Sequence, residues 1–450
     1  MENKPKLTVS GYRGVWGETL DEQLSFEFGL AYAKLIKKNN GKKIIIGRDS
    51  RKSGPKIFEI LKLAFKKEKI SVIDASVIPT PSILLFVKKL KFDGGIIITA
   101  SHNPKEYNGL KFVTKDGLFA GKNIIEQINE IKEHLKETYT PNKKIHYTKI
   151  DNKKFRQIHI SEILKNINTK DIRKAKYKVT VDTINGASGV IIKELLKKLN
   201  CKVKIINAKQ NGEFAHPPEP LVKNLKQISI DVIKNKSDVG FVTDPDGDRL
   251  LVVNEKGEII SEEYTMALAI KNILKKEKTD VVVNMSTSNM CKDVTESFGK
   301  KLIRSKVGEL NVVEKMFEIG STLSGEGNGG IIYPKINTAR DALVGIGVIL
   351  ELMTEQNQKI SQIVEEIPKY ILLKEKISYN GDLNLLNNKL KKVFVDNLSI
   401  DEIDGIRFDF KDSSWLHVRP SNTEPIVRIY IEAKTNKRIK EIFKKTKDAI

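Results

Sequence analysis

The chain has little of several features that mark particular protein classes. Only two of its 450 residues are cysteines, Cys201 and Cys291, and they stand alone in unrelated segments, which argues against a disulfide framework or a CxxC metal site. No apolar run approaches the ~18 residues of a membrane span, and the first residues contain no apolar signal-peptide core. We therefore expect a cytoplasmic protein that has no membrane partner.

Arginine is also scarce, although the chain is strongly basic. Of its 79 Lys and Arg residues only 12 are arginine, and with 57 Asp and Glu residues the formal net charge is +22. Such a charge can indicate a nucleic-acid partner, but the lysines are scattered along the whole chain and do not form one stripe. We interpret the charge as a compositional bias and expect no nucleic-acid partner. The few arginines are more informative, because a guanidinium binds phosphate bidentately.

The length and the order of apolar and polar segments predict four domains. Three segments, starting near Lys42, Tyr177 and Thr279, each combine an apolar strand, a polar turn and an amphipathic helix. They predict three related α/β modules with largely parallel mixed sheets. The last part of the chain combines short strands with a Lys-rich helix, which predicts a smaller α+β domain. The expected boundaries are 1–150, 151–254, 255–367 and 368–450.

A serine follows a strand-like run at the first candidate site. Residues 96–99 are apolar and β-branched, and the chain continues as ASHNP over 100–104. Ligands of α/β proteins bind beyond strand ends, so Ser101 is a candidate functional residue. Ser and Asn-Pro are also typical of a helix N-cap or a turn, which is the structural alternative. A hydrolase nucleophile elbow does not fit, because GxSxG is absent.

An acidic loop lies within residues 239–253, between two apolar runs. Asp244, Asp246 and Asp248 alternate there, and three carboxylates suit a hard cation such as Mg²⁺ or Mn²⁺ better than zinc. An EF-hand does not fit, because Arg249 stands where that loop needs glycine. The alternative is a solvated acidic turn, but three acids without an interleaved lysine repel one another unless a cation is present. The loop predicts a metal site.

Two further loops carry polar side chains suited to a sugar phosphate. GEGNGG (325–330) formally matches GxGxxG, but an apolar run and not a helix follows it, so Glu326 and Asn328 suit sugar hydroxyls better than a dinucleotide. RPSNTEP (419–425), with Arg428 beyond it, combines a guanidinium, polar side chains and backbone amides, as an anion site does. A structural turn and an exposed hairpin turn are the respective alternatives.

Taken together, these motifs resemble the α-D-phosphohexomutase family of phosphomannomutases, phosphoglucomutases and phosphoglucosamine mutases. TASHNP, DPDGDR, GEGNGG and RPSNTEP occur in the family's order and at its usual distances over essentially the whole chain, and Gly11-Tyr12-Arg13-Gly14 precedes them. The resemblance implies four domains around a central cleft. It also implies an isomerase that interconverts hexose 6-phosphate and hexose 1-phosphate through a phosphoserine and a hexose 1,6-bisphosphate.

The resemblance further implies a role for each motif. A phosphoserine carries a charge of about −1.5 to −2, so beside three carboxylates it needs cations, and a protonated His102 is one candidate. The implied catalytic residues are Ser101, Arg13, His102, Lys111 and Arg249. The implied Mg²⁺ ligands are Ser101, Asp244, Asp246 and Asp248, and the implied substrate-binding residues are Glu326, Asn328, Arg419, Ser421, Asn422, Thr423 and Arg428.

The sugar loop departs from the patterns of the family. GEGNGG matches neither the GEQSGH of bacterial phosphoglucosamine mutases nor the GEMSG of bifunctional phosphomannomutase/phosphoglucomutases. The segment RSKVGE (304–309) is more similar to the VGD-type segment of phosphoglucosamine mutases. We therefore expect glucosamine 6-phosphate as substrate, with phosphomannomutase/phosphoglucomutase activity as the alternative. A catalytically inactive sugar-phosphate-binding protein is less expected, because Ser101 and all three aspartates are present.

Overall fold

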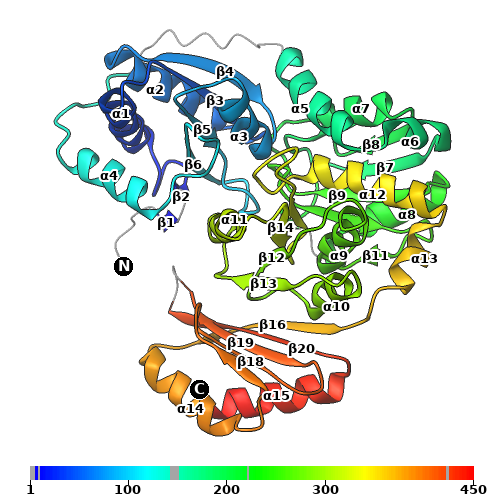
Figure 1. Cartoon of the computed structure of the whole chain (residues 1–450). Helices are drawn as coiled ribbons and strands as arrows, with labels where there is room; N and C mark the ends of the chain where they lie inside the picture. The colour runs from blue at the N-terminus through cyan, green and yellow to red at the C-terminus, as the bar shows by residue number, and fades with distance from the viewer. Residues whose placement is uncertain (1–5, 9–10, 142–151, 220–221, 422–424) are drawn as a thin grey trace. The chain divides into compact units, whose positions relative to one another are not determined.

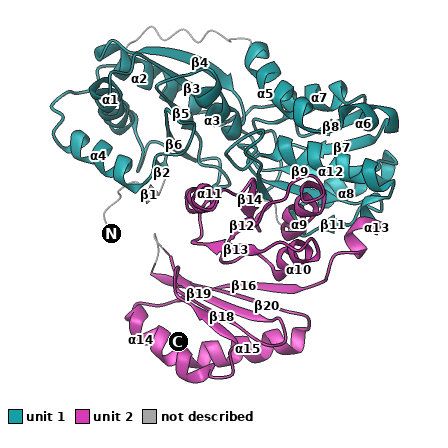
Figure 2. Cartoon of the chain, viewed as in Figure 1, with its two compact units in different colours: residues 1–261, 330–361 teal, residues 262–329, 362–450 magenta. Residues whose placement is uncertain are grey.

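A computed structural model describes residues 6–8, 11–141, 152–219, 222–421 and 425–450. These residues fall into two compact units, coloured separately in Figure 2. Unit 1 comprises residues 1–261 and 330–361, and unit 2 comprises residues 262–329 and 362–450. Each unit is therefore assembled from two stretches of sequence.

The first module of unit 1 is a six-stranded mixed sheet with strand order β1-β2-β6-β5-β3-β4 (Figure 1). β4, β3 and β5 are parallel to one another, whereas β5, β6, β2 and β1 pair antiparallel. The βα unit expected near Lys42 is confirmed by β3 and α2. The elements are β1 (Lys6–Thr8), β2 (Gly11–Val15), α1 (Glu22–Lys38), β3 (Lys43–Arg48), α2 (Gly54–Lys67), β4 (Ser71–Val77), α3 (Thr80–Lys89), β5 (Gly94–Ile98), β6 (Tyr107–Thr114) and α4 (Lys122–Glu133).

Local sequence explains how this module begins. The Asp21 carboxylate accepts a hydrogen bond from the backbone N–H of Leu24 at 2.8 Å and so caps the N-terminus of α1. Apolar residues then recur on the helix face that packs on the sheet, where Phe28 stacks on Tyr12 of β2 with ring centroids 3.6 Å apart. Burial of this face fixes α1 against the sheet.

The second module of unit 1 is a five-stranded sheet with strand order β11-β10-β9-β7-β8. β8, β7 and β9 are parallel, and β9 turns back into the antiparallel β10 with Thr243 opposite Leu250. The acidic loop is the connection between β9 and β10, as the two flanking apolar runs predict. The elements are α5 (Lys153–Asn166), α6 (Thr169–Ala175), β7 (Lys178–Asp182), α7 (Gly189–Lys198), β8 (Lys202–Ile206), the 3₁₀ helix η1 (Val222–Asn224), α8 (Lys226–Lys234), β9 (Val239–Thr243), β10 (Leu250–Val253) and β11 (Ile259–Ile260). The second stretch of unit 1 adds β15 (Gly330–Ile332) and α12 (Ala342–Gln356).

Unit 2 begins with a third α/β module, in which the parallel strands lie in the order β13-β12-β14. Its elements are α9 (Glu262–Ile273), β12 (Val281–Asn284), α10 (Asn289–Ser297), β13 (Leu302–Ser305), α11 (Glu309–Glu318) and β14 (Leu323–Glu326). The strand-turn-helix unit expected near Thr279 is confirmed by β12 and α10. The short helix α13 (Ile360–Glu365) carries the chain across the boundary between the units.

The C-terminal part of unit 2 is an antiparallel sheet with strand order β16-β20-β19-β18-β17. Ile439 and Ile442 on the C-terminal helix are buried with Leu416 and Ile431 of the sheet. The elements are β16 (Ile371–Ser378), α14 (Leu383–Val393), β17 (Ser399–Asp401), β18 (Ile406–Asp409), β19 (Trp415–Pro420), β20 (Ile426–Ala433) and α15 (Asn436–Ala449). The predicted fold class, three α/β modules and a smaller α+β domain, is confirmed. Within the described residues, no helix has the length and hydropathy needed to cross a membrane.

Candidate active site

The serine of the ASHNP motif lies directly beyond β5, on a strained piece of backbone. Ser101 is 2% exposed and has a φ of +51°, a left-handed conformation that is uncommon for a residue other than glycine. Its backbone N–H donates to Thr99 Oγ1 at 2.9 Å. The Ser101 hydroxyl donates to Asp244 Oδ2 at 3.5 Å and lies 3.3 Å from His102 Nδ1. The serine and the acidic loop, 143 residues apart in sequence, therefore meet in unit 1.

The three aspartates of the acidic loop are fully buried and converge. Asp244, Asp246 and Asp248 each offer one carboxylate oxygen, and these oxygens lie within 4.8 Å of one another. Gly247, between the last two, has a φ of +71°, which lets the loop turn tightly enough to bring them together. The Oδ1 atoms of Asp246 and Asp248 are buried and accept no hydrogen bond. Unpartnered, all-oxygen ligands at this spacing fit a divalent cation.

Cationic and hydroxyl groups of unit 1 surround these carboxylates. Asp246 Oδ2 accepts hydrogen bonds from Lys111 Nζ at 2.9 Å and Thr80 Oγ1 at 2.7 Å. Arg340 donates to Asp248 Oδ2, and Arg249 Nε lies 3.9 Å from Asp248 Oδ1. The cluster therefore already holds part of the positive charge that a phosphoryl group would require.

The pKa values of the acidic cluster show opposing effects of burial and charge. Burial raises the pKa of Asp244 well above its usual range, and the neighbouring Asp248 and Asp246 raise it further. Burial acts in the same direction on Asp246, but Lys111 outweighs it and lowers the pKa of that carboxyl. The surroundings thus favour the ionised form of Asp246 and the protonated form of Asp244. A bound cation would favour the ionised form of both carboxyls.

His102 differs from the sequence-based expectation of a protonated cation. Arg249 lowers the pKa of His102 well below its usual range, and burial and Arg13 lower it further. Burial also lowers the pKa of Arg13, which donates from Nη1 to Asn103 Oδ1 at 3.1 Å. Arg340 also lowers the pKa of His102 and Asp246 opposes this effect, so the net influence of the surroundings is against the protonated form.

The glycine-rich loop of unit 2 follows β14 and is tied to the ends of neighbouring segments. Glu326 is 2% exposed, and its Oε1 accepts hydrogen bonds from Asn284 Nδ2 at 2.7 Å and from the Gly308 N–H at 3.1 Å. Asn328 Nδ2 donates to Glu326 Oε2 at 3.2 Å. Asn284 ends β12 and Glu326 ends the adjacent parallel strand, so the two side chains meet at one edge of the sheet.

The second loop of unit 2 leaves β19, where Arg419 pairs across the sheet with Arg428 of β20. Arg419 Nε lies 3.7 Å from Asp404 Oδ2, and the Ser421 N–H donates to the Ile426 carbonyl at 3.0 Å. Arg419 and Arg428 are thus cross-strand partners beside the loop, so their side chains lie on the same face of the sheet. Two of the predicted residues, Asn422 and Thr423, lie outside the described residues.

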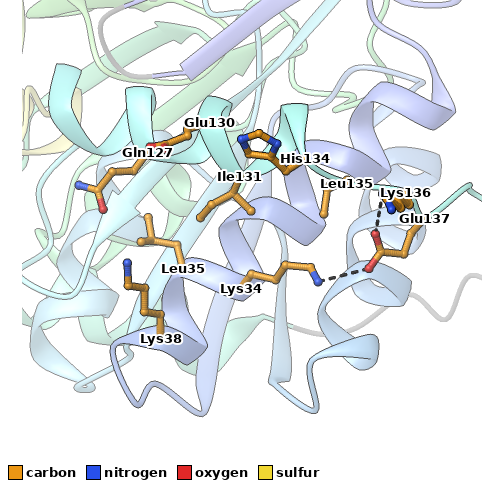
Figure 3. A pocket seen from close by; sticks show the side chains of 10 residues that line it. All are labelled: Lys34, Leu35, Lys38, Gln127, Glu130, Ile131, His134, Leu135, Lys136 and Glu137. Carbon is orange, nitrogen blue, oxygen red and sulfur yellow. Dashed lines mark hydrogen bonds and ion pairs between the residues drawn. The ribbon is translucent and has the colours of Figure 1, made fainter.

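A cavity of about 570 Å³ lies elsewhere, between α1 and the end of α4 in unit 1 (Figure 3). Lys34, Lys38 and His134 line it together with Leu35, and Lys34 Nζ forms an ion pair with Glu137 at 3.2 Å. None of the predicted site residues borders it. This cavity is therefore separate from the candidate active site.

Comparison with protein-family models decides the family. Four models match in order, described as phosphoglucomutase/phosphomannomutase α/β/α domain I (residues 4–139), domain II (157–257), domain III (261–370) and C-terminal domain (380–449). The chain belongs to the phosphoglucomutase/phosphomannomutase family. It is accordingly an isomerase, and its activity is that of a phosphohexomutase.

Relatives within this family carry different substrate names. The chain is 32% identical to a phosphoglucomutase/phosphomannomutase of Thermococcus kodakarensis, over 96% of this chain and 95% of the relative. It is 30% identical to a probable phosphoglucosamine mutase of Methanopyrus kandleri, with the same coverage. It is 32% identical to a phosphomannomutase of Methanocaldococcus jannaschii, over 97% of this chain and 96% of the relative. Identity alone therefore does not separate the sugars.

Solved structures share the fold. A phosphoglucomutase/phosphomannomutase family protein of Burkholderia thailandensis is 24% identical with a TM-score of 0.84, covering 98% of this chain and 96% of that protein. N-acetylphosphoglucosamine mutase of Aspergillus fumigatus, solved in complex with GlcNAc-6P and magnesium, is 13% identical with a TM-score of 0.56. It covers 93% of this chain and 79% of the fungal protein. Both likenesses agree with the architecture of this phosphohexomutase family member.

Sequence reasoning missed several residues that line the candidate active site in unit 1. Arg51 lies beyond β3 and donates to the Ser101 carbonyl, and Asp49 accepts from Thr99 Oγ1 at 2.6 Å. Thr80, on α3, and Arg340 reach the aspartates. One signal was available for Arg51 and Asp49, because RDSR follows a strand exactly as ASHNP does, and β3 and β5 are parallel neighbours.

Proposed function

We propose that this phosphohexomutase carries its phosphoryl group on Ser101. In the proposed cycle the bond between phosphorus and Ser101 Oγ breaks as phosphorus bonds to a free hydroxyl oxygen of the hexose phosphate, and the proton of that hydroxyl ends on Ser101 Oγ. The hexose 1,6-bisphosphate then turns round and returns its other phosphoryl group to Ser101 Oγ. In this second transfer the serine proton ends on the sugar oxygen that loses phosphorus, so the enzyme ends as it began and phosphate has only changed position.

One observation carries this proposal. Ser101 Oγ lies 3.5 Å from Asp244 Oδ2, at the rim of a fully buried carboxylate cluster that accepts hydrogen bonds from Lys111 and Arg340. Phosphoryl transfer depends mostly on positioning and on neutralising the charge of the transferring group. A hydroxyl held between carboxylates able to hold a cation and fixed basic groups meets both needs.

The aspartates Asp244, Asp246 and Asp248 are proposed to hold Mg²⁺ together with an oxygen of the group on Ser101. When bound, Mg²⁺ supplies charge neutralisation at the phosphoryl oxygens. The unpartnered Oδ1 atoms of Asp246 and Asp248 support this assignment, and so does the magnesium bound by the fungal mutase. Lys111 keeps Asp246 ionised, so this ligand is ready to bind a cation.

Cationic side chains are proposed to bind the phosphoryl oxygens that the metal ion does not bind. Arg13 and Arg249 are the candidates, because the charges of both guanidinium groups act on His102, the neighbour of Ser101. His102 itself contributes a neutral imidazole beside Ser101 Oγ. A neutral ring can donate or accept one hydrogen bond without adding charge, so it orients the serine or its phosphate.

Unit 2 is proposed to recognise the rest of the substrate. Glu326 and Asn328 would read sugar hydroxyls, and Arg419, Arg428 and the loop residues Ser421, Asn422 and Thr423 would bind the phosphate that does not react. The cross-strand pairing of Arg419 with Arg428, which puts two arginines on one face of the sheet beside the loop, supports the phosphate assignment. The fungal mutase was solved with GlcNAc-6P and also with glucose 1,6-bisphosphate, which are substrates of the same chemical class.

Glucosamine 6-phosphate is the proposed substrate, with phosphomannomutase/phosphoglucomutase activity as the second candidate. The basis is the segment Val307-Gly308-Glu309, whose Gly308 N–H donates to Glu326 of the sugar loop. That contact ties the segment used for the substrate prediction to the proposed sugar reader. The names of the relatives support both candidates.

Turnover of three sugars tests these assignments. Purified protein is assayed with glucosamine 6-phosphate, glucose 6-phosphate and mannose 6-phosphate, each with its bisphosphate activator, and kcat/KM is compared. A higher kcat/KM for mannose or glucose phosphate would select the second candidate. Absence of turnover with all three, in protein that still binds sugar phosphate, would select the inactive binding protein.

The other sequence predictions complete the proposal. The domain boundaries 1–150, 151–254, 255–367 and 368–450 are kept as proposed limits, and a cytoplasmic location without nucleic-acid or membrane partners is kept as a prediction. Limited proteolysis tests the boundaries, and retention on DNA at moderate salt tests the partner prediction.

A further inference from the structure

A buried arginine outside the four loops described above, Arg51, holds the backbone of the serine loop. Arg51 is 1% exposed, and its Nη2 donates to the carbonyl oxygens of Ser101 at 2.9 Å and Asn103 at 2.6 Å. Carbonyls of a tight loop have few partners within their own chain segment, so a guanidinium that binds two of them restricts the loop. Arg51 thus contacts the loop that carries Ser101 without contacting its hydroxyl.

A closed set of hydrogen bonds extends from Arg51 to the other side of Ser101. The Arg51 N–H donates to Asp49 Oδ1 at 2.9 Å, and Arg51 Nη1 lies 3.4 Å from Asp49 Oδ2. Asp49 Oδ2 accepts from Thr99 Oγ1, which in turn accepts from the Ser101 N–H. Arg51 therefore binds the Ser101 carbonyl directly, and Asp49 holds the Ser101 N–H through Thr99. Asp49 and Arg51 both follow β3. A residue with positive φ keeps that conformation only where its surroundings enforce it.

The second module of unit 1 covers the same guanidinium. The ring of Phe214 lies over Arg51 with its centroid 4.9 Å from the guanidinium carbon. Two residues earlier, Gly212 has a φ of +73°, and a Cβ there would lie 2.7 Å from the Ser50 carbonyl oxygen. The loop around 212–214 therefore needs glycine to approach this closely. Stacking on an aromatic face removes water from the guanidinium and strengthens its hydrogen bonds.

We propose that Arg51, covered by Phe214, is a positioning residue for phosphoryl transfer, because it fixes the backbone of Ser101 in its left-handed conformation. The inference rests on the proposed role of Ser101 as phosphoryl carrier. A displacement of about 1 Å at a reacting group can slow a reaction by about a hundredfold, so a support for the loop controls the rate. Arg51 acts through Ser101 and touches no substrate.

Arg48 is a matched control that separates a positioning role of Arg51 from a purely structural one. Arg48 is also a buried arginine at the end of β3, and its guanidinium also lies over an aromatic ring, Phe58, at 5.0 Å. Its hydrogen bonds go to Asp74 and not to the serine loop. Replacing Arg48 therefore removes similar packing and a buried ion pair from the same module while it leaves Ser101 supported.

The experiment measures phosphoryl transfer in a single turnover. Full-length wild type, Arg51→Lys and Arg48→Lys are each phosphorylated with glucose 1,6-bisphosphate, and the loss of protein-bound phosphate to glucose 6-phosphate is followed by rapid quench. We expect Arg51→Lys to transfer about 10- to 100-fold more slowly than Arg48→Lys, because lysine keeps the charge but loses the planar fork. Mg²⁺ affinity should stay within about twofold of wild type. Transfer at the wild-type rate by Arg51→Lys, or equal slowing in both variants in proportion to their melting temperatures, would overturn the proposal.

A second variant tests the aromatic cover and remains informative if Arg51→Lys does not fold. Phe214→Ala leaves Arg51 and all its hydrogen bonds, so we expect transfer to slow by about 3- to 10-fold with little change in KM. When both variants fold, the double variant should be no slower than Arg51→Lys alone, because both changes act through one guanidinium. A wild-type transfer rate in Phe214→Ala would contradict the proposed cover. So would a double variant whose rate loss equals the product of the losses in the two single variants.

Peptide mapping of phosphorylated wild type separates this inference from the proposed function. Phosphate on a residue other than Ser101 would reject the proposed carrier, whatever the variants do. Phosphate on Ser101 with wild-type transfer in Arg51→Lys would reject the positioning role alone.

Discussion

The two units use polar side chains in different ways. In unit 1 the three aspartates are fully buried, their carboxylates converge, and Lys111 and Arg340 bind them directly. In unit 2 Glu326 is held by the neutral donors of Asn284, Asn328 and Gly308, and Arg419 lies 3.7 Å from its acidic neighbour. In the acidic cluster of unit 1 carboxylates and cations are therefore in direct contact, whereas the Glu326 loop of unit 2 is held by neutral hydrogen-bond donors.

This difference matches the proposed division of roles, with reaction in unit 1 and recognition in unit 2. Buried charged groups that are already in place can stabilise a transferring phosphoryl group without moving during the reaction. The arrangement of these groups therefore has to be the same for every substrate. Replacing a donor or acceptor on a hydrogen-bonded loop costs less free energy than changing a buried charge. Substrate choice depends on how such loop contacts differ between one sugar and another. We therefore expect changes in unit 1 to lower kcat for every sugar, and changes in unit 2 to act mainly on KM and on substrate choice.

The strongest test of the comparison is the removal of the proposed carrier from unit 1. Ser101→Ala should reduce turnover of all hexose phosphates by roughly 10⁴-fold or more, because it removes the hydroxyl proposed to accept the phosphoryl group. Steady-state assays with the bisphosphate activator, together with intact mass, measure this. Near wild-type turnover by Ser101→Ala, or an unchanged mass shift on phosphorylation, would show that unit 1 does not carry the phosphate on this serine.

Removal of divalent cations should affect unit 1 almost as strongly. Chelation is expected to abolish turnover and added Mg²⁺ to restore it, because the buried carboxylates then lack their counter-ion. Asp248→Asn should weaken Mg²⁺ binding in calorimetry by about tenfold or more. The exposed acid Asp171, on α6 of the same unit, provides the control, since Asp171→Asn should bind Mg²⁺ like wild type. Full activity in metal-free buffer would exclude a required cation.

A change in the phosphate loop of unit 2 should have a smaller effect of another kind. Arg419→Lys keeps the charge but loses the bidentate fork, so kcat/KM should fall by about ten- to a hundredfold, with most of the loss in KM. Arg438 of the same domain lies over Phe410 and forms an ion pair with Asp412, so Arg438→Lys is a matched control. If both variants kept wild-type kcat/KM, the loop would not bind the substrate phosphate.

The smallest expected effect is a pH dependence of stability that originates in unit 2. Burial, with a smaller contribution from Glu262 and against the opposing effect of Lys374, raises the pKa of Glu263 to about 8. Because the unfolded chain releases this proton near pH 4.5 and the folded chain keeps it, stability is greatest below that pH. It then falls by up to about 1.4 kcal/mol per pH unit until pH 8.

Thermal unfolding between pH 6 and pH 8 checks this prediction. The wild-type midpoint should decrease by a few degrees more than the midpoint of Glu263→Gln, whose side chain does not ionise. Glu296→Gln changes an exposed acid on α10, and its unfolding midpoint should decrease by as much as that of wild type. Parallel decreases in all three proteins would show that Glu263 does not titrate in this range.

The motifs of the active site could be predicted from sequence because each is short and local. The aspartates converge within five residues of one β-turn, so the turn between β9 and β10 is sufficient to assemble them. The position of Ser101 beyond a strand end follows from the apolar run before it. Fold class was equally accessible, because strand, turn and helix repeat in a recognisable pattern along the chain.

The support for these motifs could not be predicted in the same way. Arg51 and Phe214 are 163 residues apart, and Arg340 lies 92 residues from the aspartate that it contacts. Such pairs depend on how modules pack, and spacing along the chain does not encode the distance between them. The lowered pKa of His102 could not be predicted either, because it depends on burial and on the charges of Arg249, Arg13 and Arg340, which only the fold brings near the imidazole.

The sequence by itself therefore determined the family, the order of the four motifs and the chemical type of each candidate ligand. Only the tertiary structure decided which charges are buried together, which carboxylate is held ionised and which arginine holds the left-handed backbone of Ser101. The physical reason is that residue type and local spacing specify hydrogen-bonding capacity, whereas burial and long-range neighbours specify charge state and conformation.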